Sequence, residues 1–305
     1  MSKHQKNSRQ KKRINRSLIK FVKVLFLLFE IIRFPKHFSK FSNKIFDNHQ
    51  LVILLVLKQK LRTTYRGLIE ILKVAETLRL AIGLNRIPHH TTLVKFAKKI
   101  KTKLLNLLLP HRKAEMTGLD GTGFEIENRS MHYQIRTARS TYRRYIKLSI
   151  SADLDKQIIL KHEINKSPRH DSKDFMSCIK DIKTSFVCAD KAYDSNENHR
   201  FIIQDLNAKS LIAIKNYGIK RKSWKKNWRK HALKLFDEKL YHQRSKIESI
   251  FSSIKRKYGS CLRARTFSTQ EKEIIFKLIT YNLDRKIKSI LRGFQQSQLI
   301  DKFLY

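Results

Sequence analysis

The pattern of apolar and polar positions along the chain changes character at Pro110. Before this residue apolar side chains recur at helical spacing. That spacing predicts core-facing helices over 18–34 and 51–57, and three short helices in series over 63–73, 75–84 and 88–109. After Pro110, segments rich in β-branched and apolar residues are separated by Gly or by Asp-Lys, which indicates consecutive antiparallel strands. These strands are predicted over 115–126, 142–154 and 156–164.

The remaining pattern predicts a mixed α/β order. A helix is expected over 171–182, a strand over 185–190, a helix near 198–206 and a strand over 209–214, followed by further helix. Three strands followed by alternating helices and strands is the order of RNase H-like nucleases. We therefore predict an RNase H-like domain with a mixed sheet over 111–305, preceded by an all-α region over 19–110.

The charge of the chain points to a polyanionic partner. Its 305 residues include 67 Lys and Arg against 25 Asp and Glu, a net charge of +42. A field of this size favours binding to nucleic acid or to an anionic membrane. No apolar run reaches the ~20 residues that a bilayer requires, so a membrane-spanning role is not expected. With 41% hydrophobic residues the chain is expected to fold, and its three cysteines suit a reducing cytoplasm.

The charge is distributed unevenly. Net charge is +21 over 1–110, +5 over 111–217 and +16 over 218–305, so most carboxylates lie in the middle of the chain. Residues 1–18 are basic without apolar periodicity, which predicts a flexible arm that contacts phosphates. In the helix after Pro88, Lys95, Lys98 and Lys99 share one face, as in a helix-turn-helix DNA reader. An ordinary helical domain with a solvated basic face explains the same pattern.

Two aspartates in the middle region are placed to bind metal ions. Asp120 lies inside the first predicted strand, in LDGTGF, and Asp190 ends the predicted strand SFVCAD. Two-metal phosphodiester chemistry requires carboxylates that converge from separate elements. Each residue also has a structural explanation, because Asp120 could form a hairpin turn and Asp190 a helix cap. Asp194 competes with Asp190 for the same role.

A third predicted element, a helix, combines an apolar face with a face of polar residues that could take part in catalysis. In YHQRSKIESIFSSIKRKYG, one continuous helix would place four polar residues within an arc of roughly 60°. These residues are Tyr241, Arg244, Glu248 and Lys255. The neighbouring face would carry Ile247, Ile250, Phe251 and Ile254. Alternatively, Arg244 and Glu248 form an ordinary surface pair at spacing i, i+4.

The full spacing Tyr-x2-Arg-x3-Glu-x6-Lys resembles the signature of DDE transposases of bacterial and archaeal insertion sequences. LDGTGF resembles the segment with the first Asp of that family. ADKAYDS resembles the segment with the second, usually written with Gly where this chain has Ala192. The similarity covers roughly 60–290 and excludes the N-terminal arm.

The resemblance implies a site and its partners. Asp120, Asp190 and Glu248 would form the catalytic, metal-binding triad, with two Mg²⁺ ions that Mn²⁺ can replace. Tyr241, Arg244 and Lys255 would contact transposon-end DNA near the scissile phosphate. The expected partners are double-stranded DNA at the terminal inverted repeats and at the target, and further copies of the chain in a dimer or larger multimer. The protein would work in the cytoplasm, on the nucleoid.

A basic insertion is predicted at about 216–236. The stretch GIKRKSWKKNWRKHALK has eight Lys and Arg and no acids, with Trp224 and Trp228 at spacing i, i+4. Aromatic rings among cations suit distorted or single-stranded DNA, whereas two tryptophans on an amphipathic helix can also pack in a core. An insertion that contacts DNA at this place is common in the family. His170 and Asp171, in SPRHDSKDF, are expected in a loop that enters a helix.

Three functions remain open at this point. A transposase would cleave the ends of its element and transfer the freed 3′-hydroxyl to target DNA through one metal site. A non-enzymatic DNA-binding protein derived from a transposase would lack metal-dependent nicking. An RNase H-type nuclease would need neither the basic N-terminal third nor the Trp-containing insertion.

Overall fold

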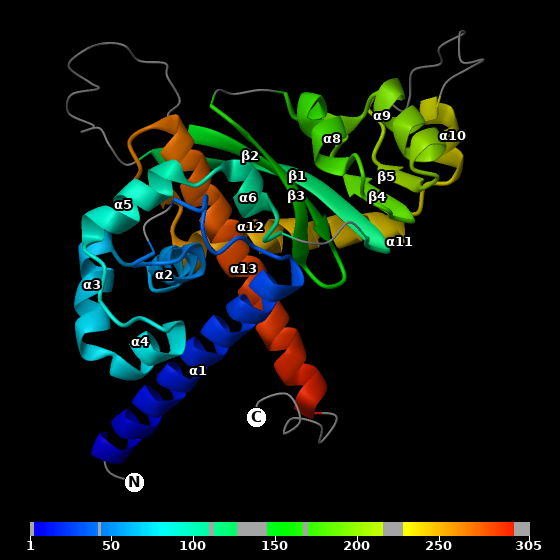
Figure 1. Cartoon of the computed structure of the whole chain (residues 1–305). Coiled ribbons are helices and arrows are strands. Elements are labelled where there is room, and N and C mark those ends of the chain that lie inside the picture. The colour runs from blue at the N-terminus through cyan, green and yellow to red at the C-terminus, as the bar shows by residue number, and fades with distance from the viewer. Residues whose placement is uncertain are drawn as a thin grey trace, which may run out of the picture. The chain divides into compact units, whose positions relative to one another are not determined.

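The computed structural model describes residues 3–41, 44–109, 113–126, 145–166, 170–215 and 228–295 (Figure 1). Two compact units divide the chain: unit 1 comprises 1–108 and 272–305, and unit 2 comprises 109–271. The C-terminal boundary differs from the sequence prediction, which extends the second domain to 305. The reason is that the long last helix begins in unit 2 and makes most of its contacts in unit 1.

The described residues of unit 1 form helices joined by turns and loops, and none of them lies in a strand. The unit contains α1 (Lys3–Ile31), α2 (Asn48–Lys60), α3 (Tyr65–Val74), α4 (Glu76–Ile82), α5 (His90–Lys99), α6 (Thr102–Asn106) and most of α13 (Phe267–Gln295). All residues from Leu51 to Leu57 in α2 are buried, as expected for a helix that is apolar on every side. The Thr280 hydroxyl of α13 donates a hydrogen bond to the Val56 carbonyl, and Asp284 pairs with Lys60. Thus α2 and α13 form the centre of this unit.

The N-terminal basic tract is part of α1. The helix runs from Lys3 to Ile31, so the arm predicted over 1–18 is helical from Lys3 onward. Lys, Arg and Gln favour helix strongly, and the segment has neither Pro nor Gly. The helix that begins in the apolar 18–31 stretch can therefore continue through the basic tract without an apolar stripe. No helix of the described residues is long and apolar enough to cross a membrane.

Unit 2 is built on a mixed sheet, as the sequence predicts. Its strands are β1 (Met116–Ile126), β2 (Tyr145–Asp153), β3 (Ile158–Asn165), β4 (Phe186–Ala189), β5 (Lys209–Ile212) and β6 (Cys261–Leu262). Their order is β3-β2-β1-β4-β5, with β6 beside the end of β1. The first three strands are antiparallel, whereas β4 and β5 run parallel to β1. This is the mixed α/β architecture expected from the order of elements.

Helices pack against both faces of this sheet. Successive side chains of a strand point to opposite faces, so Leu119 and Asp120 of β1 face different layers. Leu119 packs with Phe175 and Cys178 of α8 (Asp171–Ile179). On the other face lies α12 (Ser245–Tyr258), which contacts β1 and buries Ile247 and its other apolar residues. Figure 1 shows α8 and the yellow α12 alongside the green strands.

The connections that follow β4 and β5 contain short helical elements. After β4 come the 3₁₀ turn η1 (Lys191–Tyr193), α9 (Asn196–Arg200) and the π-helical turn η2 (Phe201–Asp205). After β5 and the basic segment come α10 (Trp228–Lys234), α11 (Glu238–Tyr241) and the 3₁₀ turn η3 (His242–Arg244), which leads directly into α12.

Candidate active site

The sheet places Asp120 and Asp190 side by side. Leu119 of β1 pairs with Ala189 of β4 in parallel register, and the next residue on each strand is an aspartate. Asp120 continues β1, and Asp190 leaves β4 as the N-terminal flank of η1. Both lie one residue beyond side chains of the α8 face, so alternation directs them to the face that α12 covers. The pattern of two parallel strands therefore accounts for the convergence of these carboxylates.

Asp120 is a partly buried acid with cations and anions around it. Its Oδ1 accepts a 2.8 Å hydrogen bond from the backbone N–H of Gly121. Burial, the largest cause, together with the charges of Asp171 and Asp190, raises the pKa of Asp120 to about 6, against the opposing effects of Gly121 and Arg244. A carboxylate whose charge is disfavoured by burial and by like charges gains from a bound cation.

Arg244 is a cation that interacts electrostatically with this cluster. Its guanidinium lies 3.0 Å from Oε1 of Glu248, the i, i+4 pair that the sequence allows. Burial lowers the pKa of Arg244, but the charges of Glu248, Tyr241, Asp190 and Asp120 together raise it above its ordinary value. Arg244 thus interacts with three carboxylates from three elements, which a simple surface pair does not do.

The segment Tyr241–Tyr258, predicted as one helix, is divided by a 3₁₀ turn. Tyr241 ends α11, Arg244 ends the 3₁₀ turn η3, and α12 begins at Ser245. A single regular helix face through all four polar residues is therefore not what the structure contains. The apolar prediction is confirmed, because Ile247, Ile250, Phe251 and Ile254 are buried.

Lys255 lies farther along the sheet than the other polar residues of this predicted face. Its Nζ stands 5.7 Å from the ring centroid of Phe124, four residues after Asp120 in β1. Burial lowers the pKa of Lys255, and the charge of Glu125 opposes this effect. The structure thus brings together Asp120, Asp190 and Arg244, with Glu248 attached through Arg244, and places Lys255 at the far end of β1.

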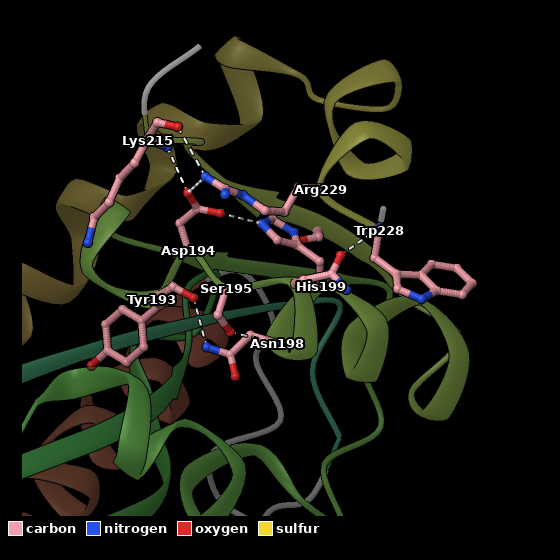
Figure 2. A network of polar contacts seen from close by, with 10 residues as sticks. Tyr193, Asp194, Ser195, Asn198, His199, Lys215, Trp228 and Arg229 are labelled. Carbon is pink, nitrogen blue, oxygen red and sulfur yellow. Dashed lines mark hydrogen bonds and ion pairs between the residues drawn. The ribbon is translucent and has the colours of Figure 1, made fainter. Parts of the chain in front are cut away.

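Asp194, the competitor of Asp190, is engaged elsewhere. Its side chain is fully buried, and both oxygens accept hydrogen bonds from residues outside the aspartate cluster: His199, the Lys215 backbone N–H and Arg229 (Figure 2). Asp190, not Asp194, therefore adjoins Asp120. Ala192 between them adopts no positive φ, since the non-glycine residues that do so lie elsewhere in the described chain. Alanine fits this turn without the backbone freedom of glycine.

Two residues beside the site, Lys147 and Asp174, escape sequence reasoning. Lys147 of β2 is almost fully buried, and its Nζ lies 2.7 Å from Asp171 and 3.1 Å from Asp174. Asp171 begins α8, as expected for a loop entering a helix, but its carboxylate also approaches Gly121, where an added Cβ would lie 3.0 Å from Oδ1. A lysine inside the apolar strand YIKLSI is the signal that indicates this buried ion pair.

The remaining DNA-binding candidates lie on α5 of unit 1, on α10 of unit 2 or outside the described residues. Lys95, Lys98 and Lys99 are exposed on α5 in unit 1, opposite the buried Leu93 and Phe96, as the sequence predicts. Trp228 begins α10 and is partly buried, with its ring centroid 6.0 Å from that of His231. Trp224 lies outside the described residues, so the pairing of the two tryptophans stays a prediction.

The carboxylates suit a hard divalent cation in their chemistry. Asp120 and Asp190 supply oxygen donors from adjoining strands, and Glu248 approaches from α12 with Arg244 among the three acids. In this conformation Glu248 pairs with Arg244, and the described residues contain no group of three His, Cys, Asp or Glu with metal-ligand geometry. Binding a metal ion would therefore require Glu248 to exchange Arg244 for the ion.

A mixed sheet with adjoining aspartates at its parallel strands, beside cationic helices, defines an α/β enzyme for phosphodiester substrates. Residues 112–283 match the family model described as "Transposase DDE domain", and the chain belongs to this family. It is a DDE-type DNA transposase, which cleaves DNA and transfers the cleaved strands. Enzymes of this family use divalent metal ions.

Curated proteins and solved structures provide two further comparisons. Among curated proteins no sequence matches this chain significantly. Among solved structures the chain is similar to a piggyBac transposase, seen by cryo-electron microscopy in a synaptic complex with hairpin DNA. The two are 10% identical in sequence with a TM-score of 0.47, and the similarity covers 90% of this chain and 76% of that one.

Proposed function

We propose that this transposase cleaves the ends of a DNA element of the insertion-sequence type with Asp120, Asp190 and Glu248 as its catalytic triad. The observation that carries the proposal is the parallel register of β1 and β4, which puts Asp120 beside Asp190 on the face toward α12. Arg244 supports it, because its charge interacts with all three carboxylates. The sheet order further supports an RNase H-like catalytic domain.

The three carboxylates would hold Mg²⁺, with Mn²⁺ as a substitute and two ions in the complete site. The bound ions would supply Lewis acidity to the phosphate and lower the pKa of the attacking hydroxyl or water. Asp120 and Asp190 are fixed by the sheet, so they would set the position of the site. Glu248 stands on a helix and is half exposed, so it would close the site from the α12 side.

Both reaction steps are in-line displacements at phosphorus. In the first, water attacks the scissile phosphate, and the 3′-oxygen of the element strand leaves as a hydroxyl. In the second, this 3′-hydroxyl attacks a target phosphodiester and displaces its 3′-oxygen. One acidic site serves both steps because the charge developing at phosphorus is the same.

Cationic and aromatic residues would hold the DNA. Released from Glu248, Arg244 would contact a phosphate near the cleavage point, with Tyr241 beside it and Lys255 farther along the duplex. Unit 1 would bind the terminal repeats through the exposed face of α5, which carries Lys95, Lys98 and Lys99, as an N-terminal DNA-binding region. Trp224 and Trp228 would stack on distorted bases. Because two element ends must be paired, the working form would be a homodimer or larger multimer on the nucleoid.

Replacement of Glu248 by glutamine tests the site. The change keeps the size of the side chain but removes a negative charge, so it should abolish cleavage and strand transfer while leaving DNA affinity within about twofold. The probe is labelled duplex DNA from the regions that flank the coding sequence, incubated with Mg²⁺ or Mn²⁺ and scored for nicks beside a gel-shift titration.

The outcomes separate the three functions. Wild-type cleavage by Glu248→Gln would contradict the proposed triad. A wild-type protein that binds the flanking DNA but never nicks it would be a DNA-binding protein only. Preference for an RNA–DNA hybrid over the flanking duplex would identify a nuclease instead.

A further inference from the structure

Asp194 is the centre of a buried polar network at the end of η1 (Figure 2). Its Oδ1 accepts a hydrogen bond from Nε2 of His199, at 3.1 Å, and its Oδ2 accepts one from the Lys215 backbone N–H, at 2.7 Å. Arg229 donates to the same Oδ2 and, at 3.0 Å, to the carbonyl oxygen of Lys215. One carboxylate therefore joins α9, the residues after β5 and the start of α10.

The network is completed by contacts around it. His199 is fully buried, and its Nδ1 lies 2.8 Å from the Ser210 hydroxyl of β5. The Trp228 backbone N–H donates to the Asn196 side chain at 2.8 Å. Burial alone would raise the pKa of Asp194, but the donors His199, Lys215 and Arg229 hold it below its ordinary value. The carboxylate therefore stays charged, and its hydrogen bonds to these donors are charge-assisted and strong.

A single turn connects this network to Asp190. The Tyr193 N–H donates to the Asp190 carbonyl at 2.9 Å, and the Asp194 N–H donates to the Lys191 carbonyl at 3.1 Å. Asn198 Nδ2 donates to the Tyr193 carbonyl at 2.7 Å, and the Tyr193 ring is buried against α8. With η1 fastened at its end by Asp194, the backbone of Asp190 has little freedom to rotate away from Asp120.

We propose that Asp194 is a positioning residue for catalysis: it fixes η1 so that Asp190 stays beside Asp120, and it joins Lys215 to Arg229. This inference rests on the proposed role of Asp190. Asp194 is not itself a metal ligand, since both of its oxygens already accept hydrogen bonds from protein donors. The two aspartates of ADKAYDS then have separate roles. Asp190 acts at the reacting phosphate, and Asp194 holds the turn that carries Asp190.

One nitrogen of the Arg229 guanidinium, Nη2, bridges two acceptors. The Arg229 guanidinium donates both to Asp194 and to the Lys215 carbonyl, and so ties the residue that follows β5 to the first turn of α10. A lysine in this place would keep the positive charge but has no planar guanidinium group. Arg229→Lys should therefore keep the charge pair with Asp194 and lose part of the bridge.

The test compares Asp194→Asn with a matched control in the same region of the full chain. Asp205 of η2 pairs with Arg200 at 3.6 Å, and both side chains are about half exposed, so Asp205→Asn removes a carboxylate that fastens nothing buried. For each variant we would measure cleavage of flanking duplex DNA with Mn²⁺, DNA affinity, and hydrogen exchange of the Lys215 amide without DNA.

Asp194→Asn should lower the cleavage rate at saturating DNA by at least about tenfold, change DNA affinity less than about twofold, and speed exchange of the Lys215 amide. Asp205→Asn should match the wild type in all three. If Asp194→Asn does not fold, Arg229→Met and Arg229→Lys take its place, with Met reducing the rate as above and Lys restoring part of it.

Normal turnover in a folded Asp194→Asn or Arg229→Met variant would overturn the inference, as would a loss of rate that only follows the unfolded fraction. A wild-type protein without cleavage would overturn the proposed function instead. In that case unchanged exchange of the Lys215 amide in Asp194→Asn would still count against the network, so the two failures remain distinct.

Discussion

Asp190 and Asp194 are separated by three residues, yet their carboxylates have different surroundings. Asp190 adjoins Asp120 through strand register, whereas Asp194 accepts hydrogen bonds from three other segments. The position of Asp190 at the end of a strand can be anticipated from the sequence, because this residue ends the apolar run SFVCA. The partners of Asp194 cannot, because His199, Lys215 and Arg229 meet it only through the fold. The sequence therefore names both candidates but does not separate them.

At the residue scale, the buried Lys147 should be important for stability. Its ammonium group pairs with Asp171 and the fully buried Asp174, which also accepts a hydrogen bond from Ser149. Lys147→Met leaves Asp174 buried without its cation, so we expect a loss of about 3–5 kcal/mol in the free energy of unfolding. The more exposed pair of Lys161 with Asp181 provides the control, and Lys161→Met should cost about 0–1 kcal/mol. Equal effects in urea titrations would contradict the buried pair.

His162 should make the stability of the chain depend on pH. It lies on β3 opposite Ile150, and burial lowers its pKa to about 4, against about 6.5 in an unfolded chain. The unfolded state therefore takes up the proton first, so stability is present above pH 6.5 and is lost as pH falls toward 4. From pH 7.5 to pH 5 this group should contribute a loss of about 1–2 kcal/mol, and His162→Gln should show a smaller loss. Identical pH dependence in both proteins would exclude this role.

At the scale of elements, the strands and the apolar stripe of α12 follow from local pattern. The alternation and the β-branched residues predict β1, β2 and β3 close to their observed bounds, with the antiparallel pairing. The 3₁₀ turn between Tyr241 and Ser245, in contrast, does not follow from local pattern. This turn changes the angular positions of Tyr241 and Arg244 relative to Glu248, and spacing counted at 100° per residue cannot anticipate it.

The apolar stripe of α12 should hold Glu248 in place. Ile250 is fully buried, so Ile250→Ala should lower the free energy of unfolding by about 2–5 kcal/mol through lost contacts and a cavity. The exposed Ser252, two residues along the same helix, is the control, and Ser252→Ala should change stability by less than about 0.5 kcal/mol. Thermal unfolding of the purified variants measures both, and a neutral Ile250→Ala would mean that α12 does not pack on the sheet.

At the scale of the whole molecule, the division into units depends on contacts that are distant in sequence. Unit 1 unites residues 1–108 with 272–305, and every residue from Lys272 to Leu283 is buried. Local pattern predicts a helix in the last part of the chain but not its partner, because α2 and α13 are more than 200 residues apart. The charge blocks counted along the sequence do not follow this division: most acids lie in unit 2, but most of the basic residues over 218–305 lie there too.

This division decides how the chain can be shortened. Deleting 1–108 alone would remove the α2 residues that pack with α13, and would expose the apolar side chains of Ile274, Ile275, Leu278 and Ile279 to water. A large apolar patch on a helix favours aggregation, so this fragment should be insoluble or oligomeric.

Removing residues beyond Glu271 as well should give a monomeric, folded unit 2 that retains its mixed sheet. Size-exclusion chromatography and circular dichroism of the two fragments check this. A monomeric and cooperatively folded 109–305 fragment would show that α13 does not need unit 1, and would restore the domain boundary predicted from the sequence.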